Sequence, residues 1–479
     1  MHRRGGGVPA LALLLAVFAA SCRQPERRVD ETPGRTEPSA GGWKTWVLAG
    51  PSQIKVDPPP SAGSAAAALE QTELAELALG RTVEIRGIVE RWNQSPPFKP
   101  WTELNLELVA ARPKDPVAAS RGYAYTHVAI YDAVVSAWHW KQVYKRPGPE
   151  KEGALVAPEP DPSYPSEHAA IAGAASRVLA YLFPERPAPL FEAMAEEVAE
   201  SRVRAGANLR SDVEAGLALG RAVGDLVVER AKADGSDRQW DGNRPRGPGF
   251  WDPPPGSTAL PVQPLAGSWE TWVLSSGSEF RPPPPPEFGS PKFLEECQEI
   301  IEIRKRLTDE QKRIAVFWAG GQGTSLPPGV WNEVTMSYVR ERLLTTPRAA
   351  RVFALGNVAM ADAGVAAWDA KYAYWNPRPE NAIRDLGLDP EWKPFLDTPF
   401  FPAYVSGHST YSGAIAEVMA YLFPEDAALF RTKAGEAGIS RLYGGIHYRS
   451  DNVAGLELGK KVGERVIQHA RADGAGPPG

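Results

Sequence analysis

Apolar residues recur along much of this chain with the spacing of an amphipathic α-helix. The pattern is clearest in the segments 213–227 and 453–466, where valine and leucine return with a period of about 3.6 residues. Alanine, leucine, glutamate and arginine dominate these regions, and the strict alternation expected of half-buried strands is scarce. The pattern therefore predicts an all-α fold of two helical bundles packed together.

Three sequence blocks occur twice in the same order. WKTWVL at 43–48 returns as WETWVL at 269–274, AYLFPE at 180–185 returns at 420–425, and the spaced residues of 201–212 return at 440–451. The offset between the copies drifts, which a few insertions explain. We interpret the blocks as an internal duplication, with related helical halves at 43–260 and 261–479.

The N-terminus has the pattern of a bacterial export signal. Arg3 and Arg4 precede an apolar run at 8–20, which is too short to span a bilayer, and small residues lead to Cys22. Residues 1–22 are therefore predicted to be a signal peptide with a lipoprotein cleavage site, and 23–42 a flexible tether. A lipidated Cys22 would anchor the chain to a membrane. The alternative is an ordinary secretory signal, and both predict an exported protein, periplasmic or membrane-anchored.

Charge and cysteine content exclude some classes of function. The 479 residues carry 53 basic and 58 acidic side chains, a net charge of -5, whereas a general nucleic-acid binder needs a basic surface. Cys22 and Cys297 are the only cysteines, so the chain has neither a disulfide framework nor a cysteine metal site. We expect a small-molecule substrate and no nucleic-acid partner.

Three motifs in the second half carry the candidate chemistry. In chain order they are Lys371 with Arg378-Pro379, then Ser406-Gly407-His408, then Ser440-Arg441 with His447 and Asp451. Arginine and lysine can hold the oxygens of a tetrahedral anion through charge-assisted hydrogen bonds. Glycine lets the backbone approach the anion closely, and the helix expected to start at Ser409 would add favourable N–H groups. The motifs therefore predict an oxyanion site.

The spacing within the last motif predicts a positioned histidine. His447 and Asp451 lie four residues apart, which places them on one face if the segment is helical. Asp451 could then orient the imidazole. Each of these residues taken singly is more often structural, and only the ordered combination indicates a catalytic site.

Together the three motifs resemble the signature of the superfamily of type 2 phosphatidic acid phosphatases and vanadium haloperoxidases. The departure is Val405, where the family usually has proline before the serine. Segments 318–332 and 368–372 also resemble bacterial haloperoxidase-like proteins. Trp368 and Phe401 match the offsets of aromatic residues that form the halide pocket in that family; plain core packing is the other interpretation of these two side chains.

The resemblance implies a vanadate cofactor coordinated by His447, with Asp451 setting the tautomer of the ring. Lys371, Arg378, Ser406, Gly407 and Arg441 would bind the vanadate oxygens. Lys371 would polarise bound peroxide, and His408 would assist proton transfer during halide oxidation.

The same pocket could hold phosphate instead. In that acid phosphatase, His447 would attack phosphorus to form a phosphohistidine, and His408 would protonate the leaving alcohol. A third possibility, from a different class, is an idle binding lipoprotein, which the intact motifs argue against. The sequence leaves open which halide or organic substrate is used, and the oligomeric state.

The first half is predicted to be a degenerate copy. Its counterpart of the Ser-Gly-His loop is Ser166-Glu167-His168, which places a carboxylate where glycine is expected. Asn208 stands in the place of His447, and the position of Lys371 aligns at about Val134. Arg146-Pro147 is displaced by an insertion. We therefore expect only the second half to be catalytic.

Overall fold

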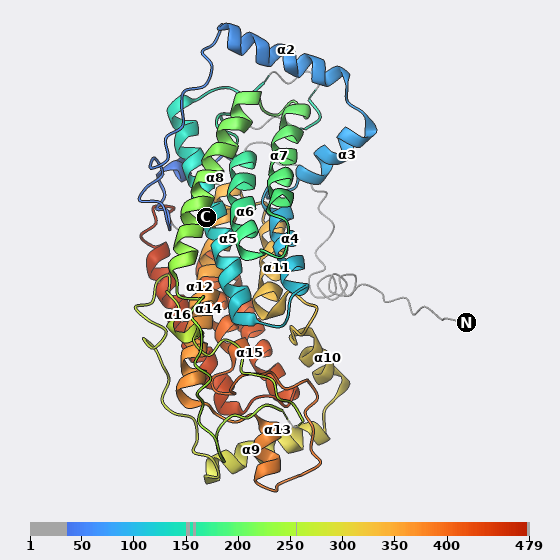
Figure 1. The fold of residues 1–479 in the computed structure, drawn as a ribbon, viewed down its shortest axis with the longest axis vertical. Coiled ribbons are helices and arrows are strands. Elements are labelled where there is room, and N and C mark those ends of the chain that lie inside the picture. The colour runs from blue at the N-terminus through green and yellow to red at the C-terminus, as the bar shows by residue number, and fades with distance from the viewer. Residues whose placement is uncertain (1–35, 150–153, 157–159, 255, 477–479) are drawn as a thin grey trace, which may run out of the picture. The chain divides into compact units, whose positions relative to one another are not determined.

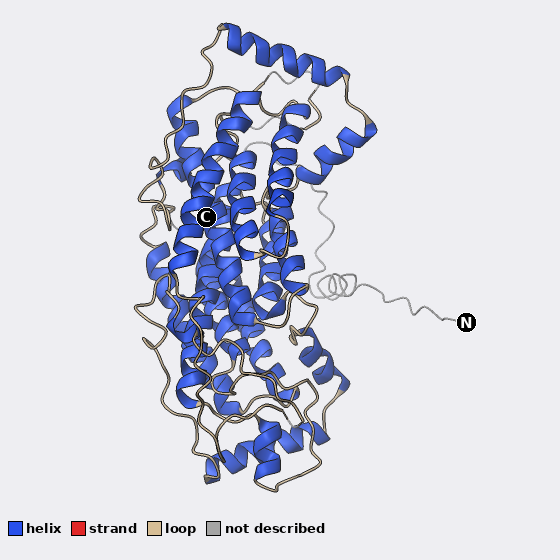
Figure 2. Ribbon diagram, viewed as in Figure 1, coloured by secondary structure: helices blue, strands red, loops and turns tan. Residues whose placement is uncertain are grey.

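The computed structural model describes residues 36–149, 154–156, 160–254 and 256–476. Within these ranges the secondary structure is helical and contains no strand (Figure 2). The predicted all-α class is therefore confirmed. The predicted signal segment 1–22 with Cys22, and the first part of the tether, lie outside the described residues. In the part that is described, no helix combines the length and apolar character needed to cross a membrane.

The first half begins with peripheral elements and continues into a bundle (Figure 1). The peripheral elements are η1 (Pro38–Gly42), α2 (Ala65–Leu79) and α3 (Val83–Trp92). The bundle contains α4 (Lys99–Ala110), α5 (Pro116–Tyr144), α6 (Glu167–Leu182), α7 (Ala188–Arg204) and α8 (Arg210–Ala233). Helix α6 packs against α5, α7 and α8, so it is the centre of this bundle.

The second half repeats this order. It starts with η2 (Ala266–Ser268), α9 (Pro291–Lys305), α10 (Asp309–Phe317) and α11 (Leu326–Glu341). It continues with α12 (Thr346–Tyr374), α13 (Pro379–Asp385), α14 (Gly407–Leu422), η3 (Pro424–Asp426), α15 (Ala427–Tyr443) and α16 (Arg449–Ala470). Helix α14 packs against α12, α15 and α16, as α6 packs against its neighbours, and α5 packs on α12 between the halves.

Matched hydrogen bonds support the duplication. The buried Asp132 carboxylate on α5 accepts from the backbone N–H groups of 46–48, and the buried Asp362 carboxylate on α12 accepts from those of 272–274. Both helices have 29 residues, and the two carboxylates occupy the same position in them. Each carboxylate therefore fixes its copy of the repeated tryptophan block against the long helix of its own half.

Glycines allow one helix pair in each half to approach closely. A methyl group added at Gly220 on α8 would overlap the Ala170 carbonyl of α6, and one added at Gly459 on α16 would overlap the Thr410 carbonyl of α14. This contact places the N-terminus of α14 beside the N-terminus of α16. The Ser406 N–H accordingly donates to the Asp451 carbonyl oxygen at 3.0 Å. Two of the predicted motifs are thus brought together by backbone packing.

The predicted tether ends earlier than expected. Residues 38–42 form η1, in which Ala40 and Gly41 are buried against α5, and Glu37 forms an ion pair with Arg348 at 2.8 Å. The prediction of a flexible segment through residue 42 is therefore wrong for 36–42. Small residues at these positions fit closely between elements, and their composition alone resembles that of a linker.

The connection between the halves packs on the second half. The Trp251 N–H donates to the Trp375 carbonyl oxygen at 2.6 Å, and the Val262 N–H donates to the Phe400 carbonyl oxygen at 2.8 Å. The division of the halves at residue 260 stays a prediction about the repeat, because the chain from Thr36 onward forms a single compact unit.

Candidate active site

His447 lies in the turn between α15 and α16 and is nearly inaccessible to solvent. Its Nδ1 lies 2.8 Å from Oδ2 of Asp451, and its Nε2 lies 3.0 Å from Nη1 of Arg378. Burial, and then the charges of Arg378 and Lys371, hold the pKa of His447 well below its usual range. A neutral ring that donates from Nδ1 to the carboxylate has its lone pair on Nε2, where it accepts from the guanidinium.

Asp451 is the orienting group that the sequence predicted. It is fully buried in the first turn of α16, and its Oδ2 also accepts from the Tyr448 N–H at 3.1 Å. Burial raises the pKa of Asp451 to about 7. Because the carboxylate is held by its own helix terminus, it fixes both the position and the tautomer of His447.

Arg378 precedes α13 and is completely buried. Its Nε donates to the Phe401 carbonyl oxygen and its Nη1 to the Ile446 carbonyl oxygen, both at 2.7 Å. Its Nη2 is buried and has no acceptor among the described residues. Burial lowers the pKa of Arg378 to about 10, so the side chain still carries its charge at neutral pH.

Arg441 and Lys371 complete the cationic surroundings. Arg441 at the end of α15 donates from Nη2 to the Ala315 carbonyl oxygen at 3.1 Å, and burial lowers its pKa to about 9. Lys371 on α12 donates to the carbonyl oxygens of Pro402, Ala403 and Val405 at 2.8, 3.0 and 2.6 Å. Its ammonium therefore supports the loop that carries Ser406, and its expected contact with the oxyanion stays a prediction.

The Ser-Gly-His motif forms the start of α14. Ser406 is the N-cap, and its side chain accepts from the Ser409 N–H at 3.4 Å. Gly407 is the first helical residue, and a side chain there would point toward Trp368 and Tyr411. The predicted helix thus begins two residues earlier than expected. Gly407 at the positive end of its dipole lines the same cavity as His447, and the expected position of the anion near this helix terminus stays a prediction.

His408 is half-buried, and its Nε2 lies 2.8 Å from the Trp318 carbonyl oxygen. A carbonyl accepts only from a protonated nitrogen, so Nε2 carries the hydrogen and Nδ1 the lone pair. Burial, and then the charges of Arg441 and Lys114, hold the pKa of His408 well below its usual range. The ring is therefore neutral and can take up a proton at Nδ1.

A cavity lies between three of the motif residues and an apolar wall. Gly407, His408 and His447 line it together with Trp368 and Phe401, whose rings lie 5.0 Å apart. The remaining lining residues, which the sequence reasoning missed, are Lys114, Pro116, Pro327, Pro399, Tyr411 and Ile446. The predicted aromatic residues thus face the cavity. The residues at 114 and 116 come from the first half, and no motif or spacing could have pointed to them.

The donor set fits a tetrahedral oxyanion. Two arginines and a helix N-terminus surround a neutral imidazole, and the buried Nη2 of Arg378 needs an acceptor because an unpaired buried donor is costly. Within the described ranges, no group of three or more His, Cys, Asp and Glu side chains could hold a metal cation. The site therefore suits an anion such as vanadate or phosphate, with Nε2 of His447 as its nitrogen ligand or nucleophile.

The matching position in the first half differs in charge. Lys141 occupies on α5 the position of Lys371 on α12 and likewise donates to a loop carbonyl, that of Pro162. The expected match at Val134 is therefore wrong, because the two long helices align without an insertion and the extra residues fall after them. Arg146 donates to Asp212 at 2.9 Å and to Glu70 at 2.6 Å, so its charge is neutralised by carboxylates.

The first-half counterpart of the Ser-Gly-His loop contains a carboxylate. Glu167 stands where Gly407 stands in the second half, and it accepts from Nε1 of Trp138 at 2.6 Å. The matching Trp368 instead donates to the Val262 carbonyl oxygen at 3.1 Å, and its ring lines the cavity. Asn208 accepts from Ser166 at 3.4 Å in the place of His447.

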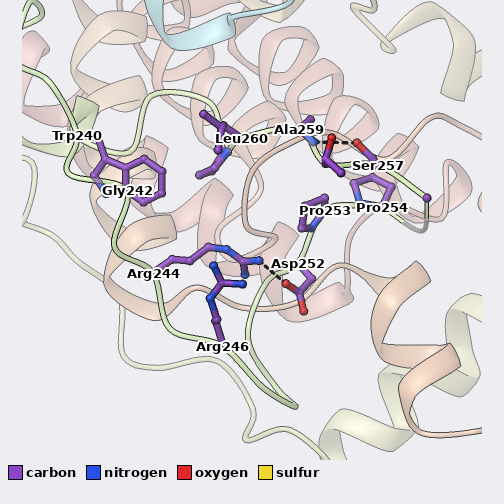
Figure 3. A pocket seen from close by; sticks show the side chains of 13 residues that line it. Trp240, Gly242, Arg244, Arg246, Asp252, Pro253, Pro254, Ser257, Ala259 and Leu260 are labelled. Carbon is purple, nitrogen blue, oxygen red and sulfur yellow. Dashed lines mark hydrogen bonds and ion pairs between the residues drawn. The ribbon is translucent and has the colours of Figure 1, made fainter.

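A second hollow lies on the connection between the halves (Figure 3). It is lined by residues of 240–261, among them Arg244, which pairs with Asp252 at 2.6 Å. None of the residues of the three motifs lines it.

Comparison with protein families distinguishes the two halves. The model described as the VCPO second helical-bundle domain matches residues 351–436 and 428–474, and the model of the PAP2 superfamily matches residues 117–233. The first half, although it lacks the histidine, is thus still similar to the phosphatase superfamily. The second half is similar to the haloperoxidase domain.

Characterised relatives match over short segments. The vanadium chloroperoxidase of Curvularia inaequalis is 32% identical over 129 residues, which are 22% of this chain and 21% of that protein. The lipid A 1-phosphatase of Rhizobium etli is 37% identical over 89 residues, which are 19% of this chain and 38% of that protein. The chain therefore spans well under two thirds of either relative.

Solved structures match over most of the chain. A bacterial vanadium-dependent iodoperoxidase is 26% identical with a TM-score of 0.66, and the match covers 78% of this chain and 95% of that one. A holo-type bacterial vanadium-dependent chloroperoxidase is 16% identical with a TM-score of 0.58, covering 81% and 96%, which shows a shared fold. The arrangement of both bundles, and not the second bundle alone, is therefore common to these proteins.

Proposed function

We propose that this chain, which belongs to the superfamily of vanadium haloperoxidases and type 2 phosphatidic acid phosphatases, oxidises halide with hydrogen peroxide at a vanadate held by His447. One observation carries the proposal: the Nε2 lone pair of a neutral imidazole faces a buried guanidinium whose Nη2 has no acceptor in the described residues. An oxyanion would give Nη2 the acceptor it lacks and would lie where Nε2 can serve as its nitrogen ligand.

Each part of the site has a defined task in this proposal. His447 would hold vanadate through Nε2, while Arg378, Arg441, Ser406 and the Gly407 N–H would surround its oxygens. Bound vanadate would supply a Lewis acid that activates peroxide at constant oxidation state. Lys371 holds the loop of Ser406 in place through its carbonyls.

His408 would handle the protons. Its Nδ1 carries the lone pair and its ring is neutral, so it can accept a proton from peroxide on entry and return it to the product. The Trp318 carbonyl keeps the other nitrogen protonated. The wall of Trp368 and Phe401 would exclude water around the reacting halide.

Halide oxidation is favoured over phosphate transfer by the similarity in architecture. The structural match to the bacterial iodoperoxidase includes both bundles and 95% of that chain, and the sequence match to the vanadium chloroperoxidase covers 129 residues against 89 for the lipid A 1-phosphatase. The cavity is lined mainly by aromatic and proline side chains, which suit a small ion better than a polar phosphate ester.

Phosphatase activity is the second candidate, because the same geometry serves it. With phosphate in the site, Nε2 of His447 would attack phosphorus, and His408 would protonate the leaving alcohol. The segment shared with the lipid A 1-phosphatases supports this alternative.

A paired assay tests the proposal. The purified chain is freed of phosphate, loaded with orthovanadate, and assayed for oxidation of iodide and bromide with peroxide. Hydrolysis of a chromogenic phosphate ester is measured in parallel without vanadate. We expect halide oxidation that requires vanadate and is lost in His447→Ala.

The opposite result is equally informative. Ester hydrolysis that vanadate inhibits, without oxidation of either halide, would identify a phosphatase on a haloperoxidase scaffold. Loss of activity in His168→Ala but not in His408→Ala would place the reaction in the first half and overturn the assignment of the site. Absence of both halide oxidation and ester hydrolysis would indicate a binding protein instead of an enzyme.

A further inference from the structure

A lysine of the first half lines the cavity of the second half. Lys114 lies in the short loop between α4 and α5, more than 250 positions before the motif residues His408 and His447 that share the cavity with it. Its backbone N–H donates to Gln322 Oε1 at 2.9 Å, and Gln322 Nε2 donates to the Arg112 carbonyl oxygen at 2.7 Å. The side chain of Gln322 therefore holds the loop at both Arg112 and Lys114, which fixes the backbone position from which the lysine side chain enters the cavity.

The ammonium of Lys114 has no acceptor in the structure as far as it is described: no carbonyl or side chain takes a hydrogen bond from its Nζ. Burial, and then the charges of Arg441 and Arg378, lower the pKa of Lys114 to about 8, and Asp397 opposes this shift. The side chain is thus still mainly charged at pH 7. A cation in a largely apolar wall without a partner calls for an anion.

The two lysines near the site differ in their free donors. The Lys371 ammonium donates to three loop carbonyl oxygens, so Lys114 is better placed to bind an anion that enters from solvent. The duplication shows that this charge is not part of the scaffold. By the alignment of α5 with α12, the residue of the second half that matches Lys114 is Leu344.

Lys114 shares its cavity with both His408 and His447, and its charge is among those that lower the pKa of His408. Neither Arg378 nor Arg441, which we assign to the oxyanion, is among the residues that line this cavity. An anion held by Lys114 would therefore lie beside the oxyanion and not in its place.

We propose that Lys114 binds the halide and thereby makes the first half a contributor to the active site. The inference rests on the proposed function, because the halide is the second anion of that reaction while peroxide is neutral. Removing the charge should weaken halide use alone.

Steady-state kinetics test this with a matched set of variants. Lys114→Met should raise the KM for bromide at least about tenfold, as expected for loss of a charged hydrogen bond, with kcat at saturating bromide changed less than about twofold. Lys114→Arg should restore the KM to within about threefold. Lys99→Met is the control. Lys99 pairs with Glu103 on α4, so this substitution removes the same charge outside the cavity.

A measurement without turnover separates this inference from the proposed function. Acylation of Lys114 by acetic anhydride is followed by mass spectrometry at pH 8 with and without bromide, in the vanadate-loaded chain. Protection of Lys114 but not Lys99 by bromide supports the inference even if no halide is oxidised, in which case only the proposed function fails. This experiment uses the unchanged chain and so stands if Lys114→Met does not fold.

Two results would overturn the inference. One is active protein in which Lys114→Met leaves the KM for bromide unchanged and bromide gives no protection. The other is a rise of at least about tenfold in the Kd for orthovanadate with the KM for bromide unchanged, which would assign Lys114 to the oxyanion instead of the halide.

Discussion

The two halves of this chain share a scaffold and differ in the charged groups around the buried arginine that follows the long helix. Both contain a long helix with a lysine near its end, a serine that caps the central helix of the bundle, and an aspartate at the start of the last helix. In the second half the arginine keeps a buried donor without an acceptor among the described residues. In the first half Glu70 and Asp212 neutralise the arginine, and Glu167 occupies the position of a glycine.

This difference is what we expect if the first half is a degenerate copy of the candidate oxyanion site. Internal carboxylates supply the negative charge that a bound anion would have supplied, so the buried cations remain partnered. The first half thus satisfies its buried arginine without a bound anion. In our proposal it also supplies Lys114 to the neighbouring cavity.

The largest effect is expected when His447 of the second half is replaced by asparagine, the residue found at the matching position of the first half. His447→Asn removes the Nε2 lone pair, which is the ligand or nucleophile in both candidate reactions, so activity should fall at least about 1000-fold. The assay is peroxide-dependent halide oxidation or, in the alternative, ester hydrolysis. Asn208→Ala in the first half is the matched control and should change activity less than about twofold.

A smaller effect, on anion binding, is expected when the glutamate of the first half is placed at the matching glycine of the second half. Gly407→Glu would place a carboxylate beside Trp368, where it repels an oxyanion, and should raise the Kd for orthovanadate about 100-fold in calorimetry. Gly407→Gln separates charge from size and should cost much less. Equal weakening by both variants would show that space, and not charge, retired the first site.

The shared scaffold predicts equal costs at equivalent positions. Asp132→Asn and Asp362→Asn each turn an acceptor of three backbone N–H groups partly into a donor, and each should cost about 2 kcal/mol of stability. Thermal unfolding of the two variants checks this. Midpoints that fall by clearly different amounts would contradict the view that the two tryptophan blocks have the same structural role.

The smallest effect concerns an asymmetry between the long helices. His127 on α5 is fully buried and burial lowers its pKa to about 3, whereas the matching Asn357 on α12 is hydrogen-bonded to Asn332 at 2.7 Å. Because the unfolded chain takes up a proton that the folded chain refuses, this histidine makes stability fall as the pH drops below about 6.5. The loss at pH 5.5 relative to pH 8 should be about 1.4 kcal/mol.

His127→Leu should remove that part of the acid sensitivity, since leucine fits between Phe98 and Phe353 without a titrating group. Denaturant unfolding of both proteins at pH 5.5 and 8 measures the difference. An unchanged pH dependence would mean that the ring is protonated or hydrated in the folded state.

Much of this could be read from the sequence because it depends on local pattern. The helical period, the repeated blocks and the order of the three motifs are properties of short segments, and the predicted residues Ser406, His447 and Asp451 do meet in space. The match of Val134 to Lys371 was wrong because alignment by residue counting misplaced an insertion. The packed segment 36–42 was missed because small residues resemble a linker until their neighbours are known.

The sequence by itself determined the fold class and predicted the duplication and the residues of the candidate anion site, since periodicity and motif spacing record which residues face a common side. Tertiary structure alone decided which donors remain free. It showed that Lys371 is occupied by carbonyls, that Arg378 is not fully paired among the described residues, and that Lys114 crosses from one half to the cavity of the other. Hydrogen-bond satisfaction and contacts between distant segments depend on packing in three dimensions, and linear spacing carries no record of them.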